Sequence, residues 1–141
     1  MSPRFSLTGL LRVRRIQQDQ AQGVLAARNA RLRENDAVRE RALRHLAGFG
    51  EPAMSLETLR AVAAARAAGA GMLGELQTRR AGLEAGVAEA RTAHREARIR
   101  TRGIERLESS HDARARAEDL HAEQLRLDEL GAARSANREE P

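Results

Sequence analysis

The scarcity of helix-breaking residues is the feature that most constrains the fold. Proline occurs only at positions 3, 52 and 141, so almost the whole chain lacks the residue that interrupts helices most strongly. The one strong break is the stretch GFGEPAMS, in which Gly48 fits the position just past a helix end. Ser55 fits the N-cap of a following helix, and Glu57 is favourably placed in its first turn. The sequence therefore predicts two helices joined by one turn.

The expected boundaries follow from this break. We expect one coiled-coil domain over 1–134, with a helix over about 5–47, a turn over 48–55 and a helix over about 56–134. The tail 135–141 shows no periodicity and is expected to be frayed.

The composition argues against a compact core. Only Phe5 and Phe49 are aromatic, much of the 41% hydrophobic fraction is alanine, and 32% of the residues are charged. A compact core draws on bulky side chains, whereas Ala, Glu, Arg and Leu at this density are typical of a long helix or coiled coil.

Apolar residues recur at spacings of three and four in both predicted helices. Such a narrow seam predicts an all-α, two-helix antiparallel coiled-coil hairpin. Polar residues at seam positions, such as Arg14, Arg28, Asn35 and Arg39, are expected to weaken it. The seam positions are Leu7, Leu11, Ala21, Leu25, Leu32, Ala42 and Leu46, with Phe49 at the end, and Leu59, Val62, Leu73, Leu76, Leu83, Val87, Ala90, Ala97 and Ile104.

A change of phase in the apolar stripe is expected near Leu107, after which it continues through Ala113, Ala117, Leu120, Leu127 and Leu130. A hairpin folded at 48–55 would pair residue 7 with about residue 97, leaving everything beyond about residue 100 without an intrachain neighbour. At 1.5 Å per residue, this overhang to residue 134 would extend on the order of 50 Å. An unpaired amphipathic helix is marginal alone, so the overhang predicts a partner protein.

Glycines interrupt the second helix at Gly69, Gly71, Gly74, Gly82 and Gly86. Each costs a helix about 1 kcal/mol relative to alanine. Two interpretations are open: close approach of the other helix, or a flexible stretch that lets the hairpin bend against partners.

Enzymatic, metal and cofactor chemistry find no support in the sequence. There is no cysteine, and none of the four histidines (45, 94, 111 and 121) has another histidine three or four residues away. No phosphate-binding glycine loop has its strand-to-helix context. We therefore expect no catalysis, no cofactor, no metal and no small-molecule substrate.

No segment approaches the roughly 20 apolar residues of a membrane span, and the N-terminus has no secretory signal, which predicts a cytoplasmic protein.

Nucleic acid is an alternative ligand. All 25 basic residues are arginine, and the clusters RVRR at 12–15 and RIRTR at 98–102 would lie near each other in the hairpin. Stacking aromatics are missing, however, and residues 117–141 carry seven acids against three arginines. Direct nucleic-acid binding is therefore the weaker hypothesis.

The layout of the chain resembles the FliJ family of flagellar export stalk proteins over nearly its whole length. The resemblance rests on a short N-terminus, a long helix, a break and a longer helix. The matching residues are Phe5, Leu7, Leu10, Leu11 and Arg14, then Arg102, Glu105, Arg106 and Leu107, then Glu123, Gln124, Leu127, Asp128 and Glu129. The break departs from the family pattern, because it is glycine-rich and lacks nearby aromatics.

The resemblance implies a cytoplasmic component of the flagellar type III export apparatus, peripheral to the inner membrane at the flagellar base. It would insert into the hexameric export ATPase, promote its assembly and bridge to the cytoplasmic domain of the export gate, with export chaperones as further candidate partners. The implied ATPase-ring contacts are Arg100, Arg102, Arg106, Leu107, Leu120, Glu123, Gln124, Leu127, Asp128 and Glu129. The candidate gate-facing residues are Leu43, Leu46, Leu59 and Val62. An injectisome-type export stalk and a generic coiled-coil scaffold remain open alternatives.

Overall fold

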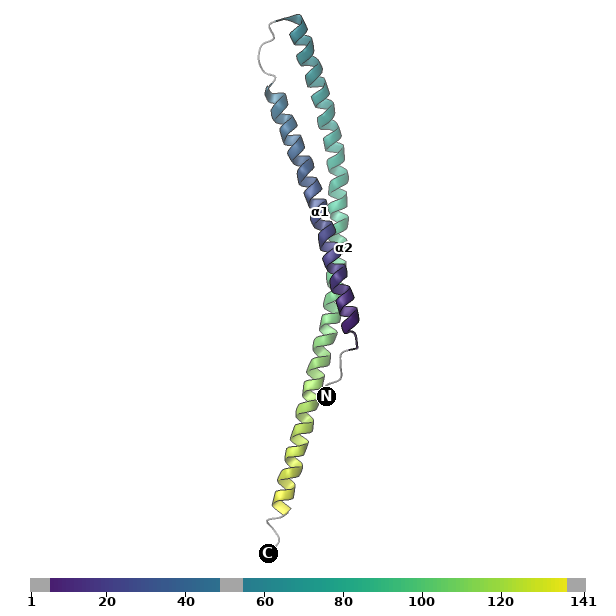
Figure 1. Cartoon of the computed structure of the whole chain (residues 1–141), viewed down its shortest axis with the longest axis vertical. Helices are drawn as coiled ribbons and strands as arrows, with labels where there is room; N and C mark the ends of the chain where they lie inside the picture. The colour runs from purple at the N-terminus through teal and green to yellow at the C-terminus, as the bar shows by residue number, and fades with distance from the viewer. Residues whose placement is uncertain (1–5, 49–54, 137–141) are drawn as a thin grey trace. The chain divides into compact units, whose positions relative to one another are not determined.

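Two long helices make up the described part of the chain. The computed structural model describes residues 6–48 and 55–136, and in these ranges it contains α1 (Thr8–Ala47) and α2 (Leu56–Ala136) and no strand (Figure 1). The predicted all-α helical hairpin is confirmed. The chain divides into two compact units, a hairpin unit (Gln17–Ala97) and a terminal unit (Met1–Ile16 with Arg98–Pro141). Phe5, Phe49 and most of the predicted tail lie outside the described residues.

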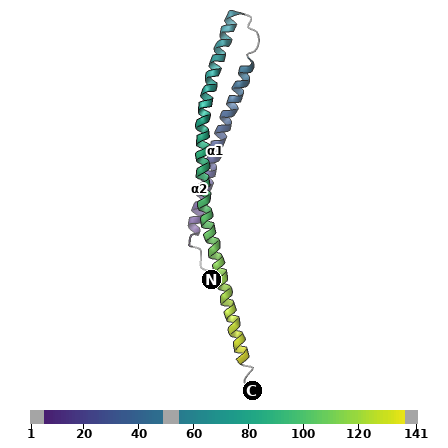
Figure 2. The same cartoon turned by 180° about the vertical axis from the view of Figure 1, so that it is seen from behind.

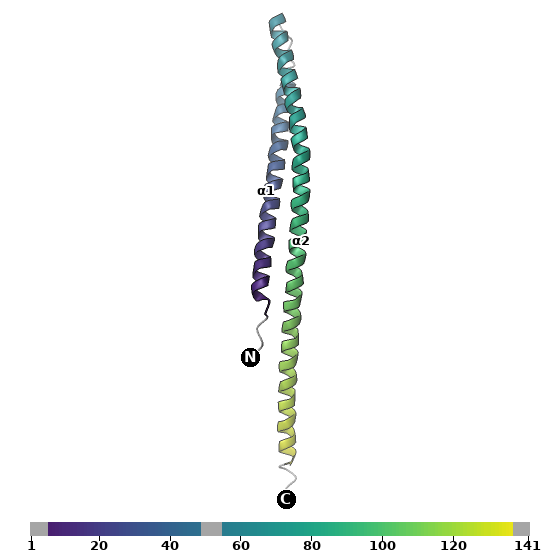
Figure 3. The same cartoon turned by 90° about the vertical axis from the view of Figure 1, so that its right-hand side faces the viewer.

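In the hairpin unit, α1 and α2 run side by side in opposite directions, as the views of Figures 1 and 3 agree. The buried side of α2 carries Leu76, Val87, Ala90 and Ala97, all of them predicted seam positions. Their spacings of eleven, three and seven residues keep them on one narrow face. The core is thin, because a two-helix seam covers only one stripe of each helix.

The register of the hairpin differs from the predicted one. The side chain of Leu46 lies against Gly69, where a Cβ atom would come within 2.4 Å of Leu46 Cδ2, whereas a tight fold at 48–55 would have placed Leu46 near residue 57. Helix α2 therefore begins beyond the end of α1, as Figures 1 and 2 show. Residues 55–61 are all exposed. The prediction assumed that the shortest turn sets the register, but specific contacts further along the helices set it instead.

The start of α2 is capped as predicted. The backbone N–H of Thr58 donates a hydrogen bond to Ser55 Oγ over 3.1 Å, which satisfies one of the unpaired amides at the helix N-terminus. Glu57 lies in the first turn, where its charge is favourable to the helix dipole.

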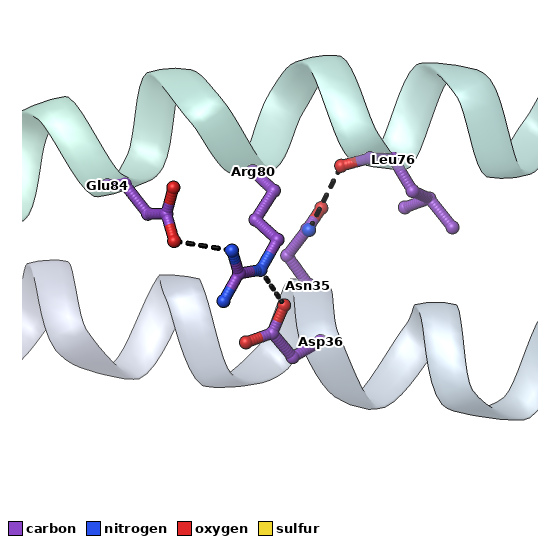
Figure 4. A network of polar contacts seen from close by, with 5 residues as sticks. All are labelled: Asn35, Asp36, Leu76, Arg80 and Glu84. Atoms are coloured by element: carbon purple, nitrogen blue, oxygen red, sulfur yellow. Dashed lines mark hydrogen bonds and ion pairs between the residues drawn. The ribbon is translucent and has the colours of Figure 1, made fainter.

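Polar contacts at the seam of the hairpin unit run from the buried Asn35 to the partly exposed Asp36, Arg80 and Glu84 (Figure 4). Asn35 is 5% exposed, and its Nδ2 donates to the backbone carbonyl of Leu76 over 3.2 Å. Arg80 Nε donates to Asp36 Oδ1 over 2.8 Å, and its Nη1 contacts Glu84. The hydrogen bond to Asp36 and the two carboxylate charges raise the pKa of Arg80 further above its already high usual value. These contacts join α1 to α2 at one level of the seam.

The five glycines of α2 between Gly69 and Gly86 fall into two groups. Gly69 lies against Leu46, and a Cβ at Gly86 would come within 3.2 Å of Arg28 Nη1. At Gly71, Gly74 and Gly82, by contrast, a Cβ would meet nothing within 4 Å. Close helix approach therefore explains the first two glycines and leaves the other three without a packing role within the described chain.

The terminal unit is also built from both helices. Leu11 is buried, and Thr101, which is 3% exposed, donates its hydroxyl hydrogen to the carbonyl of Arg14 over 3.2 Å. Arg15 Nη2 lies 3.3 Å from Glu105 Oε1. The expectation that α2 lacks an intrachain neighbour beyond about residue 100 is therefore wrong at Thr101 and Glu105. The cause is again the register, because α1 lies further along α2 than a tight turn would place it.

The covered face of α2 continues in phase through the terminal unit. Among residues 98–135, the part-buried or buried ones are Thr101, Ile104, Glu105, Glu108, His111 and Ala115, and they recur at spacings of three and four. Leu107, by contrast, is 53% exposed. The predicted stripe that changes phase near Leu107 therefore belongs to a different face of α2 from the covered one.

Candidate interaction surface

The last part of α2 is helical and uncovered. Every residue from 116 to 135 is exposed, although the helix continues to Ala136. Leu120 and Leu127 are 65% and 61% exposed, and Leu125 and Leu130 are also exposed. In this unit α2 continues well past the first turn of α1 (Figure 3). Large apolar side chains at regular spacing on an uncovered helix are typical of a protein-binding surface.

Helical periodicity shows which predicted contacts share a face. Leu127 follows Leu120 by seven residues, about two turns, so the two side chains point to the same side. Arg102 lies 18 residues before Leu120, which is about five turns. Arg106 and Gln124 each lie four residues beyond one of these positions. Arg102, Arg106, Leu120, Gln124 and Leu127 therefore form one continuous face of α2, which we call the contact face.

The other predicted ring contacts lie off this face. Leu107 precedes Leu120 by 13 residues, a rotation of about 140° from it on a regular helix. Arg100 and Glu129 likewise point towards the far side of α2, while Glu123 and Asp128 flank the contact face on either side. The helix thus separates the predicted set into one coherent face and a remainder that a single flat partner surface would not reach.

One arginine of the basic cluster 98–102, predicted only as part of a nucleic-acid patch, lies beside the contact face. Arg98 lies four residues before Arg102, which places it on the same side of α2. The cluster 98–102 carried the signal, but a sequence cannot show which of its arginines share one side.

The four candidate gate-facing residues do not form one surface in the way that the residues of the contact face do. Leu43 is 37% and Leu59 is 55% exposed, whereas Leu46 and Val62 are part-buried. Leu46 is also the member that lines a shallow, mainly apolar groove between α1 and α2, together with Ala42, His45, Ala65, Ala68, Gly69 and Met72. Leu59 belongs to the part of α2 that lies beyond the end of α1, and it does not line this groove.

Within residues 6–48 and 55–136, no group of three or more His, Cys, Asp or Glu side chains is placed to hold a metal ion. In the same ranges, neither helix has a stretch long and apolar enough to cross a membrane.

Fold and surface together define a two-helix coiled-coil protein with an uncovered contact face on its longer helix. The family model described as "Flagellar FliJ protein" matches residues 3–140, so the chain belongs to the FliJ family. The resemblance noted from the sequence is confirmed. Members of the FliJ family are non-enzymatic components of flagellar export, and the chain is therefore an export-related flagellar protein. Comparisons with curated proteins and with solved structures found no match.

Proposed function

We propose that this chain is the stalk of the flagellar export apparatus. It inserts its terminal unit into the hexameric export ATPase, promotes assembly of the ring and couples the ring to the cytoplasmic domain of the export gate. The protein itself performs no catalysis and acts in the cytoplasm, at the membrane only through the apparatus it joins. Export chaperones are further candidate partners.

The observation that carries this proposal is the uncovered end of α2. Twenty consecutive helical residues, 116–135, are exposed, and Leu120, Leu127 and Leu130 stand among them. Burying such side chains against a partner would remove apolar surface from water, at roughly 25 cal/mol per Å².

The candidate for the gate contact is the opposite end of α2, near the turn. Leu59 is exposed there, and the apolar groove beside Leu46 lies close by along the hairpin unit. Contacts at both ends of one helix would let the protein bridge two partners.

The test is ATP hydrolysis by the flagellar export ATPase of the same organism, with and without this protein, together with sizing of the ATPase ring. We expect stimulation and ring formation with the native chain. Leu127→Asp should lose most of both effects, because it places a charge in the contact face.

Leu125→Asp is the matched control, because Leu125 is about as exposed as Leu127 (51% and 61%) but lies on another side of α2. It should retain most of the stimulation. Equal loss in both variants would contradict a directional contact face. No stimulation by the native, folded chain would contradict the stalk function itself.

A further inference from the structure

The register of the hairpin unit is not fixed by the connection between its helices. Leu46 lies against Gly69, which is 13 residues beyond Leu56, the first residue of α2. This offset leaves room for α1 to lie seven residues closer to the start of α2, with Leu46 opposite Val62. A shift of seven the other way would place Leu46 opposite Leu76, about 30 Å along α2 from its first residue. That distance is close to the full reach of the eight residues that join the helices, so only the first shift is open.

Apolar contacts distinguish these two registers poorly. The seam pattern repeats every seven residues, so the shift brings Leu25 to the place of Leu32. Asn35 does not distinguish the registers either, because its Nδ2 donates to a backbone carbonyl, that of Leu76, and every turn of α2 offers another. The charged side chains beside the seam do distinguish them.

Two arginines of α2 have a carboxylate of α1 at their level in the observed register. Asp36 Oδ1 accepts a hydrogen bond from Arg80 Nε over 2.8 Å (Figure 4). Glu34 and Arg79 line the same cavity between α1 and α2. Arg31 lines this cavity as well, so Glu34 also offsets a like charge there.

The shift would remove both carboxylates from this level. Each residue of α1 would be replaced by the one seven places before it, which puts Ala27, Arg28 and Asn29 in the places of Glu34, Asn35 and Asp36. The two arginines of α2 would then meet Arg28 and no acid of α1. Like charges at such short range repel one another, so the shifted register loses two attractions and gains a repulsion.

We infer that Glu34 and Asp36 select the register of the hairpin, and that without them α1 populates a second register, seven residues closer to the start of α2. The shift would move α1 by about 10 Å along α2. Because α1 is a single helix, its first turn would move as well, and about seven more residues of α2 would be uncovered beyond it. The two carboxylates therefore control the length of α2 that is free to meet a partner.

Pairs of cysteines report the register of the full chain, which contains no cysteine of its own. Leu46→Cys with Gly69→Cys reports the observed register, because a Cβ at position 69 would lie 3.0 Å from Leu46 Cγ, and so within disulfide range of its Cβ. Leu46→Cys with Val62→Cys reports the shifted register, because these positions are about 10 Å apart along the helices in the observed one. For each pair, equilibrium with glutathione gives the effective concentration of the two thiols. We call the first value divided by the second the register ratio.

Helix α1 carries four acidic residues, which divide into a test pair and a control pair. Glu34→Gln with Asp36→Asn removes the two that face the arginines. Asp19→Asn with Glu40→Gln removes the other two, which are exposed, and changes the net charge equally. We expect a register ratio of about ten or more with all four acids present. The test pair should lower it by about fivefold or more, and the control pair by about twofold or less.

A charge exchange separates selection of the register from a loss of folding. Asp36→Arg should lower the register ratio more than the test pair does, because its attraction to Arg80 becomes a repulsion. Adding Arg80→Asp should bring the ratio back to within about threefold of its original value. Circular dichroism measures the helical content of every variant.

Equal register ratios in the test and control variants would overturn the inference. So would the loss of both disulfides from a test variant that keeps its helical content, because the shifted register would then not form. If the test variant loses its helices, the charge exchange decides, and failure of Arg80→Asp to restore the ratio would overturn the inference.

Discussion

At the scale of single residues, Gly69 and Gly71 of α2 form a matched pair that measures how an added Cβ atom affects stability inside and outside the seam. Gly71→Ala should raise the free energy of unfolding by about 1 kcal/mol, because alanine is the better helix former and a Cβ there meets nothing within 4 Å. The free energy of unfolding of Gly69→Ala should be lower than that of Gly71→Ala by at least about 1 kcal/mol, because the Cβ atom at position 69 would displace Leu46. Chemical denaturation followed by circular dichroism measures both. Equal values for the two variants would contradict the contact between Gly69 and Leu46.

Asn35 is the most deeply buried polar residue of the hairpin unit, and it is only partly satisfied. Its Nδ2 has a partner in Leu76, but its Oδ1 has none in the described structure. An unsatisfied buried polar atom costs about 1–3 kcal/mol, and the neighbouring cavity, lined in part by Val38, Leu76 and Leu83, offers room for a larger apolar side chain.

Asn35→Leu should therefore raise the free energy of unfolding by about 1 kcal/mol. Asn29→Leu, at a part-buried position of the same helix, is the control and should change it by less than about 0.5 kcal/mol. A loss of stability in Asn35→Leu would show that the amide contributes more through its bond to Leu76 than its unpaired oxygen costs.

The sequence was enough to predict the positions of the helices but not the register in which they pack. Helix positions followed from the GFGEPAMS break and from the spacing of the leucines. The register of the two helices could not be predicted. Apolar residues that recur every three or four positions pack about equally well after one helix shifts by three or four residues. The choice among registers comes from contacts such as Leu46 on Gly69 and Arg80 on Asp36, which depend on side chains distant in the sequence. The contact face was found only in part, since faces require helical phase as well as composition.

At the scale of whole elements, α2 is a long helix of which only the middle is covered. A chain shortened to end at Arg116 would lose the exposed run 117–135 and the tail. Its thermal unfolding midpoint should stay within a few degrees of the native value, because residues 117–135 are all exposed. The same chain should no longer stimulate the export ATPase.

Circular dichroism and differential scanning calorimetry measure the stability of the shortened chain, and the hydrolysis assay measures its function. A large drop in the midpoint would show that residues 117–141 support the fold. Retained stimulation would place the ATPase contact elsewhere, with the turn end of α2 as the next surface to mutate.

At the scale of the whole molecule, the continuity of α2 has a mechanical consequence. One helix of 81 residues, Leu56–Ala136, carries both the uncovered end near Leu59 and the contact face near Leu127. No loop separates these two positions along the chain, because every residue between them belongs to the same helix. Gly71, Gly74 and Gly82 lie close together in this helix, and a Cβ at any of them would meet nothing within 4 Å. Because glycine weakens a helix and these three have no packing contact to hold them, we expect the hairpin part of α2 to bend most easily there.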